Sequence, residues 1–202
     1  MSEQQRERRT VAGQVELRAT AGEPTKLVGY AAVFNEETVI GSWFRERIAP
    51  GAFADAIARP DDVRAHFNHE PNLILGRNAA GTLTLEEDAR GLKYEITLPE
   101  TSYARDLAVS VERGDVTQSS FMFAIDKDDD EDWDYSETKA GKLPLRTVKA
   151  VTLYDVSPVV FPAYESTTVS ARALVLKDDR PTVPDHAAEH LAALLDLDEA
   201  SA

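Results

Sequence analysis

The sequence predicts a β-rich α+β domain built around a compact antiparallel sheet or barrel. Short apolar runs, several with partial alternation, recur from residue 11 to residue 161. Glycines and prolines separate these runs at close intervals, as turns between neighbouring strands require. Two stretches with helical signals, residues 50–58 and 101–113, interrupt the series.

The first half of the chain is expected to begin with a hairpin and to continue as a series of strands. Residues 11–19 and 26–34 are the two predicted strands of the hairpin, joined by the turn Ala-Gly-Glu-Pro. Pro50 stands where the first turn of a helix over residues 50–58 tolerates a missing N–H. Four further strands are predicted at residues 63–67, 73–75, 82–86 and 92–98.

A helix and more β-structure are predicted for the second half. Tyr103 and Leu107 have helical spacing, and Gly114 suits the position just after a helix over residues 101–113. Apolar runs at residues 116–125, 148–156 and 159–161 then predict strands, with a strongly acidic insert at residues 126–134 between the first two.

The chain is expected to contain one protease-sized domain between two shorter segments. We predict an N-terminal arm and first strand at residues 1–24, the domain at residues 25–176, and a linker with an amphipathic helix at residues 177–202. The predicted helix either docks on its own domain or grips a partner. The apolar and capping positions that predict it are Asp185, Ala187, Ala188, Leu191, Leu194 and Leu195.

Composition excludes several classes of function. The absence of cysteine excludes thiol chemistry, disulfides and thiolate metal sites, and fits a reducing cytosol. A net charge of −14 opposes binding to phosphate backbones, so nucleic acid is not an expected partner. The N-terminus has no apolar signal segment and no stretch is long enough for a membrane span, so a soluble, non-secreted protein is expected.

The histidines and the acidic insert give weak indications of metal binding. His186 and His190 are four residues apart on the predicted tail helix, but no third ligand is in register, and a solvated surface is the simpler interpretation. His66 and His69 lie three apart, so on a continuous strand they would point to opposite faces and would not share a metal. The acidic insert lacks the glycine of a calcium-binding loop, and we expect no metal or cofactor.

Two serines, a histidine and an aspartate are candidates for serine-protease chemistry. Ser119 and Ser120 stand at the start of an apolar strand, and a nucleophilic serine needs such a fixed backbone. His69 stands at a strand end, where a sheet can present an imidazole to a cleft. Asp155 lies in an apolar run and therefore needs a specific partner, either a histidine or backbone amides near Ser157.

Six blocks together resemble the HK97-type phage prohead (capsid maturation) serine proteases. The resemblance covers about residues 26–172 and rests on the order and spacing of the blocks. The blocks are Gly-Tyr-Ala-Ala-Val-Phe at 29–34, Phe-Arg-Glu-Arg-Ile-Ala-Pro-Gly-Ala-Phe at 44–53, Phe-Asn-His-Glu-Pro at 67–71, Leu-Gly-Arg at 75–77, Ser-Phe-Met-Phe at 120–123, and Asp-Val-Ser at 155–157 with the following Pro-Ala at 162–163.

The resemblance implies a role for each candidate residue. His69 is the general base, Ser120 is the nucleophile, and Asp155 is the third member, whereas His66 and Ser119 are neighbours without a catalytic role. The related herpesvirus assembly proteases use a second histidine as the third member, and the sequence offers no obvious one. Met122 stands where the family usually has glycine, which implies a narrower or reshaped cleft.

The resemblance also implies fold, substrate and location. The fold would be a closed or nearly closed antiparallel β-barrel core with a few surrounding helices, like that of the herpesvirus proteases. The enzyme would cut the scaffolding protein or the scaffolding region of the major capsid protein, and itself, inside the prohead in the host cytoplasm, with self-association possible. One alternative is a catalytically inactive capsid-assembly scaffold module. Another is an unrelated soluble binding domain whose acidic insert recruits a cation or a basic protein.

Overall fold

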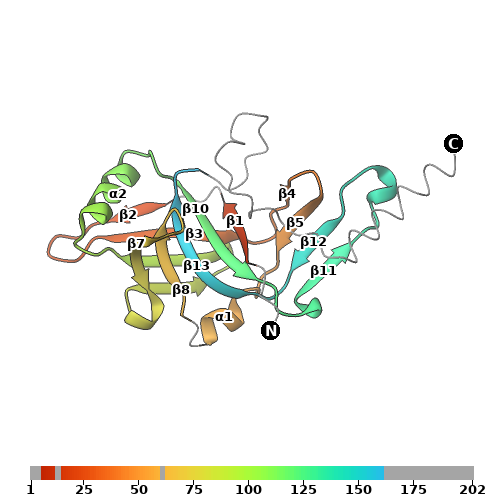
Figure 1. Ribbon diagram of the computed structural model, residues 1–202, viewed down its shortest axis with the longest axis horizontal. Helices are drawn as coiled ribbons and strands as arrows, with labels where there is room; N and C mark the ends of the chain where they lie inside the picture. Colours follow the sequence, from red (N-terminus) through yellow and green to blue (C-terminus); the bar gives the residue numbers. More distant parts are fainter. Residues whose placement is uncertain (1–5, 12–14, 60–61, 162–202) are drawn as a thin grey trace. The chain divides into compact units, whose positions relative to one another are not determined.

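The structure is a computed structural model and describes residues 6–11, 15–59 and 62–161. Its strands form three sheets (Figure 1). The predicted linker and tail helix, with His186 and His190, lie outside the described residues.

The five-stranded sheet has the order β1-β10-β13-β6-β7. Neighbouring pairs in it are antiparallel except β13 with β6, which is parallel. Its strands are β1 (Glu7–Val11), β10 (Gln118–Ala124), β13 (Thr152–Val159), β6 (Arg64–Phe67) and β7 (Glu70–Arg77).

A four-stranded antiparallel sheet with the order β2-β3-β9-β8 supplies the other side of the core. On β9, Leu92, Tyr94 and Ile96 are fully buried while the residues between them are partly exposed, so the period-two pattern sends one face inward. The strands are β2 (Glu16–Arg18), β3 (Lys26–Val33), β9 (Gly91–Thr97) and β8 (Leu83–Glu87).

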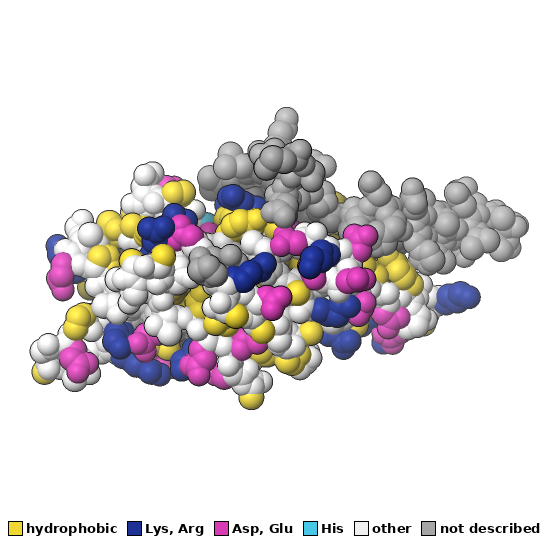
Figure 2. Space-filling view, turned by 90° about the horizontal axis from the view of Figure 1, so that it is seen from below, with side chains coloured by type: hydrophobic (Ala, Val, Ile, Leu, Met, Phe, Trp, Pro, Cys, Tyr) yellow, Lys and Arg dark blue, Asp and Glu magenta, His cyan; other side chains and the backbone are white. Residues whose placement is uncertain are grey.

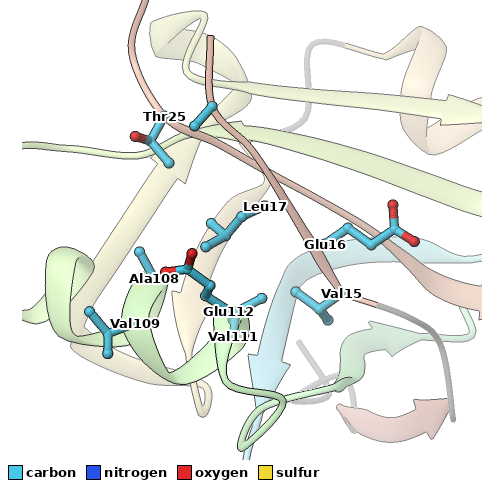
Figure 3. Close-up of a pocket in the computed structure, with 9 residues that line it drawn as sticks. Val15, Glu16, Leu17, Thr25, Ala108, Val109, Val111 and Glu112 are labelled. Carbon is cyan, nitrogen blue, oxygen red and sulfur yellow. The ribbon is translucent and has the colours of Figure 1, made fainter. Parts of the chain in front are cut away.

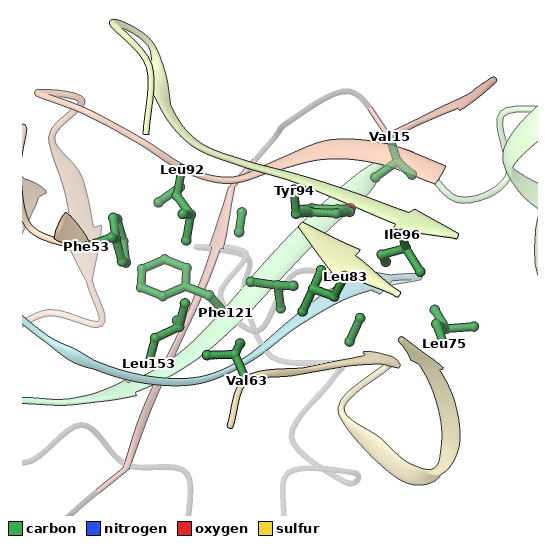
Figure 4. Close-up of a cluster of buried hydrophobic side chains, with 14 of the residues drawn as sticks. Val15, Phe53, Val63, Leu75, Leu83, Leu92, Tyr94, Ile96, Phe121 and Leu153 are labelled. Carbon is green, nitrogen blue, oxygen red and sulfur yellow. The ribbon is translucent and has the colours of Figure 1, made fainter. Parts of the chain in front are cut away.

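The core lies between these two sheets. Figure 4 shows Leu92, Tyr94 and Ile96 of β9 on the opposite side of the core from Phe121 of β10 and Leu153 of β13. Gly29 on β3 leaves room for the Tyr94 ring, because an added Cβ would come within 2.5 Å of the Tyr94 hydroxyl. The Tyr94 hydroxyl lies 2.7 Å from the Ser119 hydroxyl of β10, so the two sheets pack closely at a strand that carries the candidate site.

The third sheet has the order β11-β12-β5-β4, with a parallel pair between β12 and β5. Its strands are β11 (Glu131–Asp134), β12 (Leu145–Val148), β5 (Phe44–Ile48) and β4 (Thr38–Ile40). The acidic insert thus contributes a strand that the sequence did not predict.

Two α-helices are described, together with three 3₁₀ turns. Helix α2 (Ser102–Glu112) buries Ala104, Leu107 and Val111 and ends before Gly114, whose φ is +79°, which confirms the predicted helix. Helix α1 (Ala54–Ala58) is shorter than predicted, because residues 51–53 form a turn and Pro50 precedes the helix. The 3₁₀ turns are η1 (Asn78–Ala80), η2 (Asp128–Asp130) and η3 (Thr138–Ala140).

The expected closed or nearly closed antiparallel barrel is wrong. In the described part of the chain none of the three sheets closes, since the five-stranded sheet ends at β1 and β7 and the four-stranded sheet opposite ends at β2 and β8. The parallel pairs β13/β6 and β12/β5 also contradict a wholly antiparallel core. Alternation indicates only that one strand face is buried, and two facing sheets satisfy that pattern as well as a barrel does. The β-rich α+β description agrees with the structure in part.

Candidate active site

Ser120 lies on β10 with its side chain on the opposite face from that of Ser119. Along β10, Ser119 belongs to the row of side chains that faces the core, and its hydroxyl lies 2.7 Å from the Tyr94 hydroxyl. Ser120 points to the other face, opposite Ser157 of β13. Because side chains alternate along the strand, Ser119 contacts the core and Ser120 lies on the face where it can contact His69.

His69 is carried by the tight turn between β6 and β7. Phe67 pairs with Glu70, so the loop has two residues, and both Asn68 and His69 have positive φ, +55° and +56°. This is the φ pattern of a type I′ hairpin turn, in which asparagine is common at the first position and glycine at the second. The turn is held against β13, because the Asn68 N–H donates to the Pro158 carbonyl and the Asn68 side-chain oxygen accepts from the Val160 N–H.

Two short hydrogen bonds join His69 to the other candidates. Its Nδ1 lies 2.7 Å from Oδ1 of Asp155, and its Nε2 lies 2.6 Å from Oγ of Ser120. A carboxylate only accepts hydrogen bonds, so Nδ1 carries the proton and Nε2 of the neutral ring is free to accept one from Ser120. The structure therefore brings together all three residues that the sequence predicted for the site.

Asp155 is buried and remains ionised. Burial alone raises the pKa of a carboxyl group, but the imidazoles of His66 and His69 outweigh it and lower the pKa of Asp155 to about 2. The Ser157 hydroxyl also donates to Oδ1 of Asp155 at 3.1 Å. Of the two partners considered from the sequence, Asp155 thus has the histidine, together with the side chain rather than the backbone of Ser157.

His66 occupies a position that the sequence reasoning missed. Its Nδ1 lies 3.6 Å from Oδ2 of Asp155 and has no hydrogen-bond partner within the described structure. The expectation that His66 and His69 point to opposite faces is wrong, because β6 ends at Phe67 and the turn brings His69 back to the same carboxylate. In the sequence, the only indication that both histidines could face Asp155 was the potential for a two-residue turn after Phe67.

The Ser120 hydroxyl has a second partner on β1. It lies 2.9 Å from the backbone carbonyl oxygen of Arg9, and the side chain of Ser120 is only 1% exposed. A hydroxyl has one proton, so with a neutral His69 it donates either to Nε2 or to the Arg9 carbonyl. The sequence analysis assigned residues 7–11 to an arm and did not predict this contact.

A separate cavity of about 570 Å³ lies between β2 and α2 (Figure 3). Its described lining contains no serine or histidine, so it does not offer the nucleophile and base found around Ser120. The lining residues are Val15, Glu16, Leu17, Ala19, Thr25, Ala108, Val109, Val111 and Glu112.

On the face shown in Figure 2, acidic and basic side chains are interspersed with apolar ones. Among the described residues, no three histidine or carboxylate side chains group as metal ligands. None of the described helices combines the length and the apolar character that crossing a membrane requires.

Comparison with known proteins gives one match. A family model described as caudovirus prohead serine protease matches residues 13–179 of the 202-residue chain. No curated protein and no solved structure gives a significant match. The matched range contains Ser120, His69 and Asp155 but begins after β1.

Proposed function

Since the chain belongs to the caudovirus prohead serine protease family, we propose that it cuts the scaffolding protein, or the scaffolding region of the major capsid protein, within the prohead. Ser120 is the proposed nucleophile, His69 the base and Asp155 the group that orients His69. The observation that carries this proposal is the unbroken chain of hydrogen bonds from Ser120 through His69 to Asp155.

The proposed reaction is acyl transfer through a covalent intermediate. His69 Nε2 takes the proton of Ser120 as Oγ attacks the peptide carbonyl, and the same proton is then given to the leaving amine. Asp155 holds the ring with Nδ1 protonated and stabilises the imidazolium that forms. Backbone amides near Ser120 would stabilise the oxyanion, and water then releases the acyl group from the enzyme.

The positions of the charges support this assignment of roles. Asp155 is ionised at neutral pH, since its pKa is about 2, and an ionised carboxylate is what keeps a neighbouring histidine in the required tautomer. The side chains of Ser157 and His69 contact Oδ1 of this carboxylate, and His66 approaches its Oδ2. The base is therefore held in place by β13, the strand that also pairs with the strand of the nucleophile.

Self-cleavage and recruitment are finer parts of the same proposal. A protease packed at high concentration inside a shell meets other copies of itself, so we expect the chain to cut itself as well as the scaffold. Residues 177–202 would form a recruiting segment that follows the proposed domain at residues 25–176. A chain that lacks residues 177–202 yet enters proheads as often as the full chain would contradict the recruiting role.

The test is co-expression of the full chain with its cognate capsid and scaffolding proteins, followed by mass spectrometry of every chain over time. The wild type should trim the scaffold, whereas Ser120→Ala and His69→Ala should slow trimming by at least about a thousandfold. Ser119→Ala is the matched control, because it removes a neighbouring hydroxyl that is bonded to Tyr94 in the core. Equal trimming by wild type and Ser120→Ala would reject the proposed site and favour the inactive scaffold module.

A further inference from the structure

The strand β1 lies beside the candidate nucleophile in the way that a peptide substrate would. It pairs antiparallel with β10 along its whole length, and Thr10 stands opposite Ser120. The carbonyl oxygen of the preceding residue, Arg9, accepts a hydrogen bond from Ser120 Oγ at 2.9 Å. Addition of an extended peptide to a sheet edge is a common mode of peptide recognition, and it places one chosen carbonyl against the site.

The Arg9 side chain fills a buried acidic pocket. Its Nε and Nη2 lie 2.5 and 2.8 Å from the two carboxylate oxygens of Glu46 on β5. Its guanidinium also lies 5.4 Å from the centre of the Phe123 ring. A bidentate contact between a guanidinium and a carboxylate matches the geometry of arginine. Because this contact is buried, it has a larger effect on which side chain is accepted at this position.

The charged groups around this pocket favour a basic side chain of a bound peptide. Beside Arg9 and Glu46 it contains Glu7 of β1, Arg146 of β12 and Glu131 of β11, and Arg146 contacts all three glutamates. Two of the five charged groups, Glu7 and Arg9, belong to β1 itself. Without residues 1–9 the pocket keeps two carboxylates and one guanidinium, so it retains one uncompensated negative charge for an incoming basic side chain.

The strand β1 lies outside the range that the family model matches. It precedes residue 13, where the match to the family model begins, and it is an edge strand of its sheet. Removing it would leave β10 paired with β13, and the exposed edge of β10 could then accept another peptide.

From these contacts we propose that β1 lies in the peptide-binding groove of Ser120 as a resident substrate, and that the enzyme cuts its own bond between Arg9 and Thr10. Glu46 makes the groove selective for arginine, or lysine, at the residue before the cut bond. This inference rests on the proposed function and names a substrate class for it.

The step balances with groups that are present. Ser120 Oγ bonds to the carbonyl carbon of Arg9, its proton passes to His69 Nε2, and the bond from that carbon to the Thr10 nitrogen breaks as the nitrogen receives the proton. Water then attacks the ester, and the proton it gives up returns through His69 to Ser120. The products are a carboxylate on Arg9 and a new N-terminus at Thr10.

The experiment follows the N-terminus of the purified full chain by intact mass and terminal sequencing, with a fluorophosphonate probe to report whether Ser120 is reactive. The wild type should lose residues 1–9, and Ser120→Ala should keep them. Arg9→Lys should still be cut, whereas Arg9→Ala and Glu46→Gln should be cut at least about tenfold more slowly while probe labelling persists. Arg8→Ala is the matched control and should be cut at Arg9 like the wild type.

Each other outcome overturns the inference. A wild-type chain that reacts with the probe and trims scaffold but keeps residues 1–9 would leave the proposed function standing and reject the resident substrate. Cutting after Arg6 or Arg8, or unchanged cutting of labelled Arg9→Ala or Glu46→Gln, would reject the register or the pocket. A chain that neither reacts with the probe nor cuts anything would reject both proposals.

Discussion

His69 occupies a backbone conformation that costs free energy for any residue except glycine. Its φ of +56° lies in the left-handed region, at the turn position where glycine is preferred. Backbone strain of this kind persists where surrounding contacts hold it, and it is common at functional sites. Here the contacts that hold it are the hydrogen bonds of Asn68 to β13 and those of the imidazole itself.

We predict that His69→Gly is more stable than His69→Ala by about 1 kcal/mol. Both changes remove the imidazole and its bonds to Asp155 and Ser120, but only alanine must adopt the unfavourable φ. Urea unfolding of the two variants measures the difference. Equal stability of the two variants would mean that the turn relaxes to another backbone conformation once the imidazole is gone. Both variants should be inactive on the scaffold, because both lack the proposed base.

The ionisation of Asp155 makes a second, pH-dependent prediction. Its pKa is lowered from 3.8 to about 2 in the folded protein, so it stabilises the fold at pH values above about 4 and this contribution is lost as the pH falls toward 2. The shift corresponds to about 2 kcal/mol. Asp155→Asn should therefore lower the free energy of unfolding by about that amount at pH 7, and the deficit should shrink between pH 4 and pH 2.

Denaturant titrations at several pH values measure this deficit, with and without Asp155→Asn in the Ser120→Ala background, where both chains keep residues 1–9. A deficit that stays constant down to pH 2 would assign the loss to packing instead of charge. The matched variant is Asp106→Asn on the surface of α2, which makes the same chemical change at an exposed position.

At the residue scale, local pattern made Ser120, His69 and Asp155 candidates and the resemblance to the prohead proteases selected them, but neither indicated their surroundings. An aspartate in an apolar strand requires a partner, and a serine and a histidine at strand ends are plausible ones. The place of His66 depended on φ values at Asn68 and His69 that spacing alone does not encode. The contact from Arg9 could not be predicted, because it joins residues 111 apart in the chain.

At the scale of whole elements, apolar strands were predicted better than charged ones. β9 and β10 were predicted from their apolar runs, whereas β1, with the sequence Glu-Arg-Arg-Thr-Val, has only one apolar residue. β1 is a strand because its charged side chains find buried partners on β5 and β12, which is information that lies elsewhere in the chain. The run at residues 148–156 divides between β12 and β13, since Lys149 and Ala150 bond to the Asp130 carbonyl instead of continuing a strand.

We predict that Arg146→Met destabilises the protein by about 3–5 kcal/mol. The change leaves Glu7, Glu46 and Glu131 with too little positive charge in a buried site, which is far more costly than removal of a surface pair. The matched control is Arg45→Met on the neighbouring strand, whose partners Glu37 and Glu137 are 41% and 45% exposed. It should cost no more than about 1 kcal/mol.

Urea unfolding of both changes at neutral pH measures the two losses, in the Ser120→Ala background so that self-cleavage does not remove residues 1–9. Similar losses of unfolding free energy for Arg146→Met and Arg45→Met would show that the ion pairs of Arg146 do not attach β1 to the third sheet. A large loss for Arg146→Met alone, with faster proteolysis at residues 6–11, would show that it does.

At the scale of the molecule, the wrong prediction was the closed or nearly closed barrel, which depends on how distant strands pair with each other. The positions of the apolar strands and of α2 follow from local sequence, but sheet closure depends on which edges bond to each other across the core. Here the edges β1 and β7 do not meet β2 and β8 in a ladder. Pairings between distant segments, such as β13 with β6 and β12 with β5, leave no periodic trace in the sequence and could not be predicted from it.

The order of strands in the five-stranded sheet has a consequence for the chain during synthesis. β13 is the last described strand to leave the ribosome, yet it lies in the middle of the sheet, between β10 and β6. A nascent chain therefore holds the serine and the histidine well before it holds Asp155 or the strand that joins them. If Asp155 orients His69 as proposed, the complete site cannot form until residue 159 has emerged from the ribosome, which delays any proteolysis by the nascent chain.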